Sequence, residues 1–230
     1  LEDLGVSAYK LASMHSSEPW FARYVAKKNK PIFLSTGMST LSEIDSTVRA
    51  IKETDNNKII LLQCTTNYPS RIEDANLLAM KSMRETFNLT VGYSDHTEGN
   101  IACIASVALG AKVIEKHFTL DKSLPGPDHT TSASPTEFAT LVENIRNVEK
   151  SLGLSIKQPC EIEELNKEGM RRSVVAKYDI DKNVEITDDM IALKRPSSGI
   201  SPMYLDEIIG KKTQNKLLKG QIFKWVDIGE

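Results

Sequence analysis

Val91-Gly92-Tyr93-Ser94-Asp95-His96-Thr97 is the stretch that decides the fold, together with Val113-Ile114-Glu115-Lys116-His117-Phe118 further along the chain. Each is a short apolar run that ends in a histidine, and an alanine-rich helical pattern separates the two. The carboxyl ends of parallel strands lie side by side at one edge of a sheet, where α/β folds keep their chemistry. We therefore expect His96 and His117 to lie together, although each could also be an ordinary histidine at a strand end.

Two histidines in such a place suit a catalytic metal ion. A pair of imidazoles leaves most coordination positions to water, substrate or carboxylate, whereas a structural site is closed by protein ligands. The sequence therefore predicts a metal centre with His96 and His117 as its ligands.

The composition is that of an ordinary globular protein, with 40% hydrophobic and 26% charged residues among 230. A formal net charge of −2 gives no reason to expect nucleic acid as a partner. No apolar run approaches the roughly twenty residues that a membrane span needs. Cys64, Cys103 and Cys160 have no metal-ligand spacing, which favours a reducing cytoplasm. Because the chain enters at Leu1 directly into a strand-like run, we expect it to be a piece of a longer protein.

The first two thirds of the chain alternate between strand and helix patterns. In addition to the two strands of the opening stretch, strands are predicted at residues 7–13, 31–37 and 58–65. Helices are predicted at residues 18–28, 40–53, 75–87 and 135–152, and Thr40 and Glu43 form a capping-box pattern for the second of them. Five βα units at short, regular spacing predict a parallel sheet.

Five units are too few to close a (β/α)8 barrel, which takes roughly 250 residues. Either the sheet is open and doubly wound, or the first three strands of a barrel are missing. The strand ends carry hydroxyls, lysines and the two histidines, which predicts a polar rim that favours phosphate; these residues are Lys10, Ser13, Ser35, Thr36, Thr65, Thr66, Ser94, His96, Lys116 and His117.

After residue 152 the pattern changes to short strands and turns. Strands are predicted at residues 172–176 and 221–225, and single helical turns at residues 188–189 and 203–209. This segment predicts a small second domain that is marginally stable by itself.

Several short motifs also stand in a fixed order along the chain. They are Tyr9-Lys10, Leu34-Ser35-Thr36-Gly37-Met38, Cys64-Thr65-Thr66-Asn67-Tyr68-Pro69, Gly92-Tyr93-Ser94-Asp95-His96-Thr97, Ile114-Glu115-Lys116-His117-Phe118-Thr119-Leu120-Asp121, Pro125-Gly126-Pro127-Asp128-His129, Lys194-Arg195-Pro196 and Gly199-Ile200-Ser201-Pro202. Each is weak by itself, but the ordered set resembles the sialic acid synthase (N-acetylneuraminate synthase) family from end to end.

The resemblance implies an α/β fold in two parts. Residues 1–154 would form part of a TIM (β/α)8 barrel, about strands 4 to 8. Residues 155–169 would be a linker, and residues 170–230 would form a small, β-rich SAF (antifreeze-like) domain.

The resemblance also implies a transferase of sialic acid biosynthesis. Such an enzyme condenses phosphoenolpyruvate with N-acetylmannosamine, in its open-chain aldehyde form, and with water. The products are N-acetylneuraminate and phosphate, which leaves by carbon–oxygen cleavage. A divalent metal ion, commonly Mn²⁺, acts as the Lewis acid. A legionaminic or pseudaminic acid synthase that takes a diacetamido sugar is one alternative, and a non-catalytic carbohydrate-binding fragment is another.

The family's site residues carry over by position. His96 and His117 match metal ligands, and Lys10, Ser13, Ser35 and Ser94 match groups that hold phosphoenolpyruvate. Thr66 falls where some relatives have asparagine, and Tyr68 and Asp128 match contacts to the acceptor sugar.

Arg195 matches an arginine that the SAF domain delivers into the active site of the neighbouring subunit, which implies a domain-swapped homodimer. His15 stands where many relatives have a glutamate on the acceptor side, so the identity of the sugar is left open. His15 could donate a proton there or cap its loop. His129 is expected to be a loop residue rather than a third metal ligand.

Overall fold

The structure is a computed structural model that describes residues 1–229. The chain divides into two compact units, Leu1–Gly153 and a second unit that begins at Leu154. Among the described residues, none of the helices combines the length and the apolar character that a membrane span requires.

The first unit contains one parallel sheet of five strands. The strands follow one another across the sheet in chain order: β1 (Tyr9–Leu11), β2 (Ile32–Ser35), β3 (Ile59–Cys64), β4 (Thr90–Asp95) and β5 (Ile114–Lys116). A doubly wound sheet reverses its strand order at a switch point, so the doubly wound alternative is wrong. Sequential parallel order is the order of a barrel, and the sheet is a half-barrel. Which strands of a complete barrel it supplies stays a prediction.

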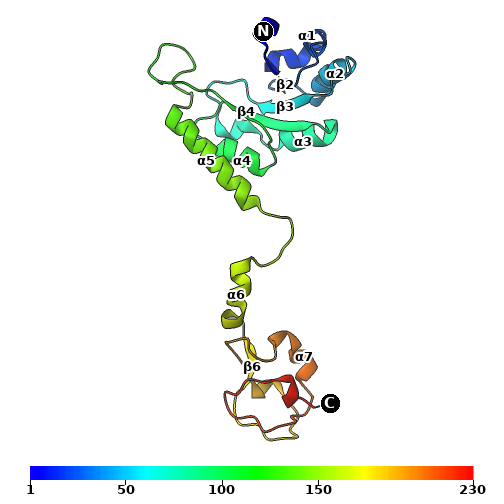
Figure 1. The fold of residues 1–230 in the computed structure, drawn as a ribbon, viewed down its shortest axis with the longest axis vertical. Coiled ribbons are helices and arrows are strands. Elements are labelled where there is room, and N and C mark those ends of the chain that lie inside the picture. Colours follow the sequence, from blue (N-terminus) through cyan, green and yellow to red (C-terminus); the bar gives the residue numbers. More distant parts are fainter. Residues whose placement is uncertain (230) are drawn as a thin grey trace. The chain divides into compact units, whose positions relative to one another are not determined.

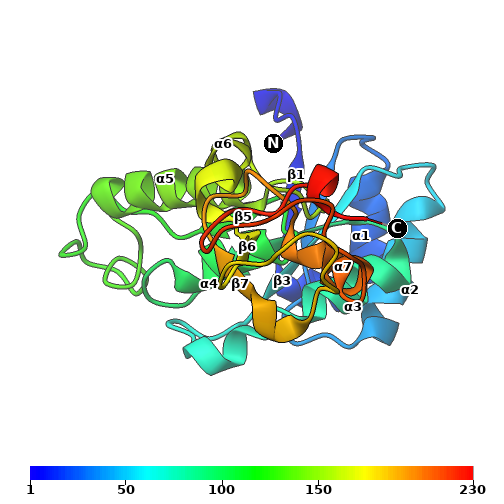
Figure 2. The same ribbon diagram turned by 90° about the horizontal axis from the view of Figure 1, so that it is seen from below.

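The helices lie along one face of the sheet, also in chain order (Figure 1). Both views place α5 at the opposite end of the sheet from α1, α2 and α3 (Figure 2). The helices are α1 (Pro19–Ala26), α2 (Leu41–Lys52), α3 (Ala79–Phe87), α4 (Ile101–Ala108) and α5 (Pro135–Leu152), and three 3-10 turns, η1 (Glu2–Leu4), η2 (Ser13–Ser17) and η3 (Ile72–Ala75), complete the unit.

Helix boundaries follow local chemistry. The predicted capping box of α2 is confirmed, because Thr40 and Glu43 bond reciprocally across the first turn. Ser134 and Glu137 do the same for α5, and Pro135 stands at its first turn, where a missing N–H costs nothing. The long segment between β5 and α5 projects away from the sheet (Figure 1).

Strand alternation divides the sheet into two faces. Alternate residues of the strands pack with the helices into the main hydrophobic core; they are Leu11, Ile32, Leu34, Ile59, Leu61, Val91 and Tyr93. The residues between them, such as Lys10, Ser35, Cys64 and Ser94, lie on the other face. We call this second face the inner face.

The second unit has its own core. An antiparallel pair, β6 (Ser173–Ala176) and β7 (Ile191–Lys194), packs around buried Ile186, Ile200 and Phe223. The other elements are α6 (Glu161–Met170), α7 (Leu205–Ile208) and the 3-10 turns η4 (Asp188–Met190), η5 (Pro202–Tyr204) and η6 (Trp225–Asp227). Helix α6 lies mostly within the segment expected to be a linker, and both predicted helical turns are present.

One predicted strand of this unit is wrong. Residues 221–225 make only an isolated bridge from Ile222 to Val175, because the chain turns into η6 immediately afterwards. Asp227 stabilises that turn by accepting a hydrogen bond from the Lys224 N–H. The strand that pairs with β6 is β7, which the sequence pattern did not indicate, while the backbones of Gln221 and Phe223 also hydrogen-bond to β6.

Gly92 makes the close contact between β4 and β5 possible. A Cβ added to Gly92 would lie 2.5 Å from the Val113 carbonyl oxygen and 2.7 Å from Leu62 Cδ2. The Val113 oxygen cannot move aside, because it accepts a hydrogen bond from the Tyr93 N–H.

We therefore expect Gly92→Ala to destabilise the first unit by about 1–3 kcal/mol, as overpacking does. Thermal unfolding followed by circular dichroism measures the effect. Gly169→Ala is the control, because nothing lies within 4 Å of its added Cβ and alanine favours a helix. Equal melting of the Gly92→Ala variant and the wild-type chain would contradict the proposed contact.

Candidate functional site

The carboxyl ends of the five strands bring most of the predicted site residues to one rim on the inner face. His96 directly follows β4 and His117 directly follows β5, and their ring centroids are 5.3 Å apart. The ring of Tyr68 lies against both, with centroid distances of 4.2 Å to His96 and 5.5 Å to His117. Histidines far apart in the sequence are thus neighbours in the fold.

A backbone contact fixes the orientation of His96. Its Nδ1 faces the carbonyl oxygen of Thr65, which can only accept a hydrogen bond, so Nδ1 carries the proton. Burial lowers the pKa of His96; the Thr65 contact raises it, nearby His117 lowers it, and the net shift is downward. His96 is therefore a neutral imidazole at pH 7, with the lone pair on Nε2.

His117 is held differently. Its backbone carbonyl accepts a hydrogen bond from the Ala133 N–H at 2.8 Å. Its Nδ1 lies 3.8 Å from a carboxylate oxygen of Asp128, which is half-exposed on the segment between β5 and α5. That separation is too long for a direct hydrogen bond but keeps a negative charge beside the imidazole.

These groups fit a divalent metal ion with two protein ligands. Among residues 1–229, no three His, Cys, Asp or Glu side chains are placed to share a metal ion. The two imidazoles of His96 and His117 would leave coordination positions of such an ion open to water or substrate, which is the pattern of a catalytic centre. Its binding there stays a prediction.

Glu115 is the residue of this rim to which the sequence assigned no role. Its Oε1 lies 3.2 Å from Lys10 Nζ and accepts a hydrogen bond of 2.6 Å from the Ser94 hydroxyl. One carboxylate thus connects two of the predicted phosphoenolpyruvate-binding side chains. The alternation of β5 could have shown this, because Glu115 and His117 share the inner face while Lys116 lies between them.

Two serines stand at the other end of the rim. The Ser13 hydroxyl accepts a hydrogen bond from the Gly37 N–H and lies 3.0 Å from the Cys64 sulfur. Ser35 Oγ is buried and has no hydrogen-bond partner among the described residues. A buried hydroxyl without a partner is costly in a finished interior and therefore indicates a position that a ligand completes. The Thr66 methyl group lies beside Gly37.

Lys116 does not belong to the rim, and its place in the predicted row of phosphate-binding groups is wrong. Its side chain turns to the helix-covered face, where Nζ lies 2.7 Å from Asp95 Oδ2, and the two side chains are 6% and 0% exposed. Burial raises the pKa of Asp95, but hydrogen bonds from Lys116 and Cys103 outweigh burial and hold the pKa below its usual value.

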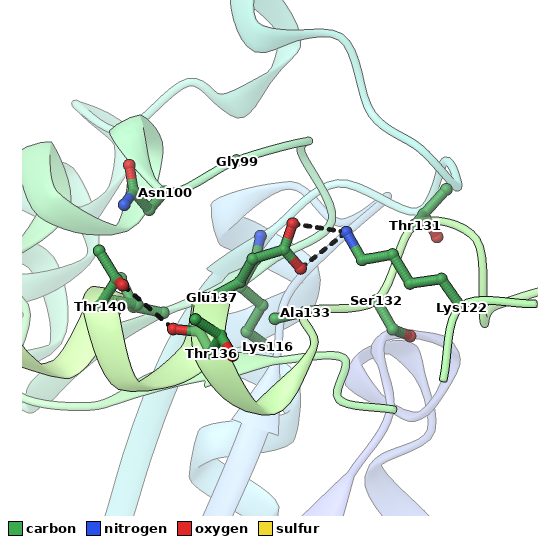
Figure 3. A pocket seen from close by; sticks show the side chains of 11 residues that line it. Gly99, Asn100, Lys116, Lys122, Thr131, Ser132, Ala133, Thr136, Glu137 and Thr140 are labelled. Carbon is green, nitrogen blue, oxygen red and sulfur yellow. Dashed lines mark hydrogen bonds and ion pairs between the residues drawn. The ribbon is translucent and has the colours of Figure 1, made fainter. Parts of the chain in front are cut away.

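A pocket of about 240 Å³ lies behind the rim, between the first turns of α4 and α5 (Figure 3). Lys116 and Leu141 line it, and Lys122 bonds Glu137 across it. The hydrogen bonds from Lys122 and from the Ser134 N–H lower the pKa of Glu137 to about 2. Apart from Lys116, none of the predicted rim residues lines this pocket, so we place the candidate site at the rim, where imidazoles and hydroxyls gather.

Three further side chains have separate places. His15 Nδ1 lies 2.8 Å from Glu18 and its ring packs against Phe21, so it is held within its loop. His129 Nδ1 is 2.7 Å from the Thr119 hydroxyl, which is a loop contact. Arg195 belongs to the second unit, where it is exposed and its Nη1 contacts the sulfur of Met170 at 3.7 Å.

Known proteins resemble the chain over nearly its whole length. An uncharacterized protein of Methanocaldococcus jannaschii is 46% identical over 99% of this chain and 68% of its own length. The N,N'-diacetyllegionaminic acid synthase of Campylobacter jejuni is 43% identical over 92% of this chain and 64% of its own length. The chain therefore spans about two thirds of these relatives.

Solved structures agree with the sequence relatives. The crystal structure of N-acetylneuraminic acid synthetase from Leptospira borgpetersenii, in complex with citrate, superposes with a TM-score of 0.67. It is 34% identical and covers 72% of this chain and 58% of its own. Residues 1–157 match the NeuB family and residues 171–229 match the SAF domain. The chain therefore belongs to the NeuB family and carries a C-terminal SAF domain.

Proposed function

We propose that this chain is the main part of an enzyme that condenses phosphoenolpyruvate with an N-acetylated amino sugar and water. The main support is the rim itself, where two neighbouring imidazoles lie in one row with a lysine and a buried hydroxyl that has no hydrogen-bond partner within residues 1–229. The names of the Campylobacter and Leptospira relatives support the same reaction class.

In this proposal, Lys10, Ser13, Ser35 and Ser94 hold the anionic groups of phosphoenolpyruvate. Lysine supplies a positive charge and hydroxyls donate hydrogen bonds to anionic oxygens. Before substrate binds, Glu115 bonds Lys10 and Ser94. Glu115 must release both side chains when phosphoenolpyruvate enters. Anionic oxygens of the substrate then take the position that the Glu115 carboxylate occupied. Thr66 adds a hydroxyl near the phosphate.

The acceptor sugar would lie on the histidine side of the rim. Tyr68 and Asp128 would bind its hydroxyls, since one carboxylate can accept from two hydroxyls at once. A divalent metal ion, which we take to be Mn²⁺, would supply Lewis acidity toward the aldehyde when bound at His96 and His117. The Thr65 carbonyl keeps His96 in the tautomer that this requires.

In the reaction, the methylene carbon of the enol double bond of phosphoenolpyruvate forms a bond to the aldehyde carbon of the sugar. Water then adds to the carbon that carries the phosphate, and phosphate leaves with its bridging oxygen. We expect N-acetylmannosamine as the acceptor and N-acetylneuraminate as the product. A diacetamido sugar is the second candidate, because the Campylobacter synthase of that class is 43% identical to this chain.

Assembly and location form part of the proposal. Arg195 would complete the site of a neighbouring subunit in a domain-swapped homodimer; its exposure in the second unit supports this. The three free cysteines favour the cytoplasm.

The decisive measurement is phosphate release from phosphoenolpyruvate with N-acetylmannosamine and with a 2,4-diacetamido sugar, in Mn²⁺ and in EDTA. We expect release that depends on both acceptor and metal, and that is lost in His96→Ala and His117→Ala. His129→Ala is the control and should retain release, because the Thr119 hydroxyl holds His129 within its loop. A folded chain that binds Mn²⁺ but releases no phosphate with either sugar would favour the carbohydrate-binding alternative.

The Ser35→Ala variant tests whether the Ser35 hydroxyl binds the substrate or stabilises the fold. Removing a buried hydroxyl without a partner should leave the melting temperature unchanged or higher, yet raise the KM for phosphoenolpyruvate about tenfold. Ser16→Ala is the contrasting variant, because Ser16 Oγ is buried and donates to the Ser13 carbonyl. It should lower stability by about 1 kcal/mol. A Ser35→Ala variant with an unchanged KM would remove Ser35 from the proposed site.

A further inference from the structure

Asp95 and Lys116 form a buried ion pair directly behind the two histidines. They are register partners in β4 and β5, and Nζ and Oδ2 are 2.7 Å apart. Each is followed in the chain by one of the histidines, His96 and His117. The same two strand ends therefore carry the ion pair on the helix-covered face and the imidazoles on the inner face.

The hydrogen bonds around Asp95 also include Thr97, so they hold the residue before His96 and the residue after it. Asp95 Oδ1 accepts from the Tyr93 hydroxyl and from both the N–H and the hydroxyl of Thr97. Oδ2 accepts from Lys116 and from the Cys103 thiol. Lys116 also donates to the Thr97 carbonyl at 2.9 Å, so three atoms of Thr97 are fixed.

His96 thus lies between two residues that cannot shift independently of β5. Its own carbonyl accepts a hydrogen bond from the Ser70 N–H, which ties it to the loop that carries Tyr68. Rotation of the strand end is therefore restricted on the Asp95 side, on the Thr97 side and at His96 itself.

We propose that Asp95 and Lys116 are positioning residues that set the separation of His96 and His117 for metal binding. This inference rests on the proposed function, because it assumes that a divalent metal ion binds the two imidazoles. The affinity of two imidazoles for a metal ion depends strongly on how well the pair is placed before the metal ion binds. Groups that orient ligands without touching the metal commonly change metal affinity 10–100-fold.

A purely structural role is the competing explanation, and it predicts a different result. A buried ion pair can be replaced by neutral side chains with little loss of stability, provided that neither charge is left alone. The double variant Asp95→Asn/Lys116→Met removes both charges together. The net charge near the imidazoles is unchanged, so a loss of metal affinity cannot come from long-range electrostatics.

The test is Mn²⁺ binding, followed by the electron paramagnetic resonance signal of free Mn²⁺, with the melting temperature measured on the same samples. We expect the double variant to melt near the wild-type temperature but to bind Mn²⁺ about tenfold more weakly. The control Lys122→Met/Glu137→Gln removes another ion pair beside the same pocket and should bind Mn²⁺ as the wild-type chain does. Equal affinity of the Asp95→Asn/Lys116→Met variant and the wild-type chain would overturn the positioning role.

A second pair of variants covers the case in which the double variant does not fold. Lys116→Arg keeps a cation beside Asp95, and the adjoining pocket of about 240 Å³ has room for the guanidinium. Lys116→Arg should retain most of the Mn²⁺ affinity. Lys116→Gln, whose amide can still donate a hydrogen bond to the buried Asp95 carboxylate, should lose it. Equal affinities of these two variants would overturn the inference. A wild-type chain that does not bind Mn²⁺ would overturn the metal site itself, and the positioning role with it.

Discussion

The two-residue alternation of β4 and β5 is the constraint on which the rest of the structure depends. Tyr93 and Asp95 face the helices, whereas Ser94 and Glu115 face the rim, and Lys116 follows the same rule. A shift of one residue in either strand would exchange the two sets and place the charged pair among the ligands. The close contact at Gly92 and the Asp95–Lys116 pair both oppose such a shift.

The sequence predicted the first unit well because its elements are locally determined. Strands covered by helices read as apolar runs, and capping boxes mark the start of α2 and α5. Strand order was left open, since periodicity does not reveal which strands are neighbours. The second unit was harder because its strands are short. Residues 221–225 look more strand-like than Ile191–Lys194, yet a capped turn interrupts the first segment and long-range pairing selects the second.

The gathering of site residues could be predicted only in part. The rule that strand ends share an edge was sufficient to bring His96 and His117 together. The rule did not place Lys116 correctly. A residue near the end of a strand can point to either face of the sheet, and Lys116 points to the helix-covered face. Glu115 went unnoticed for a related reason: its importance comes from Lys10 and Ser94, which belong to two other strands.

The sequential order of the strands has a consequence for how such a protein can diversify. Each βα unit brings its own polar groups to the rim from the loop that directly follows its strand. An exchange in one loop can reshape a single wall of the site while the groups supplied by the other units keep their places. His15, held by Glu18, belongs to the first of these loops. A lineage can therefore acquire a new ligand preference through small, separately tolerated steps without rebuilding the scaffold.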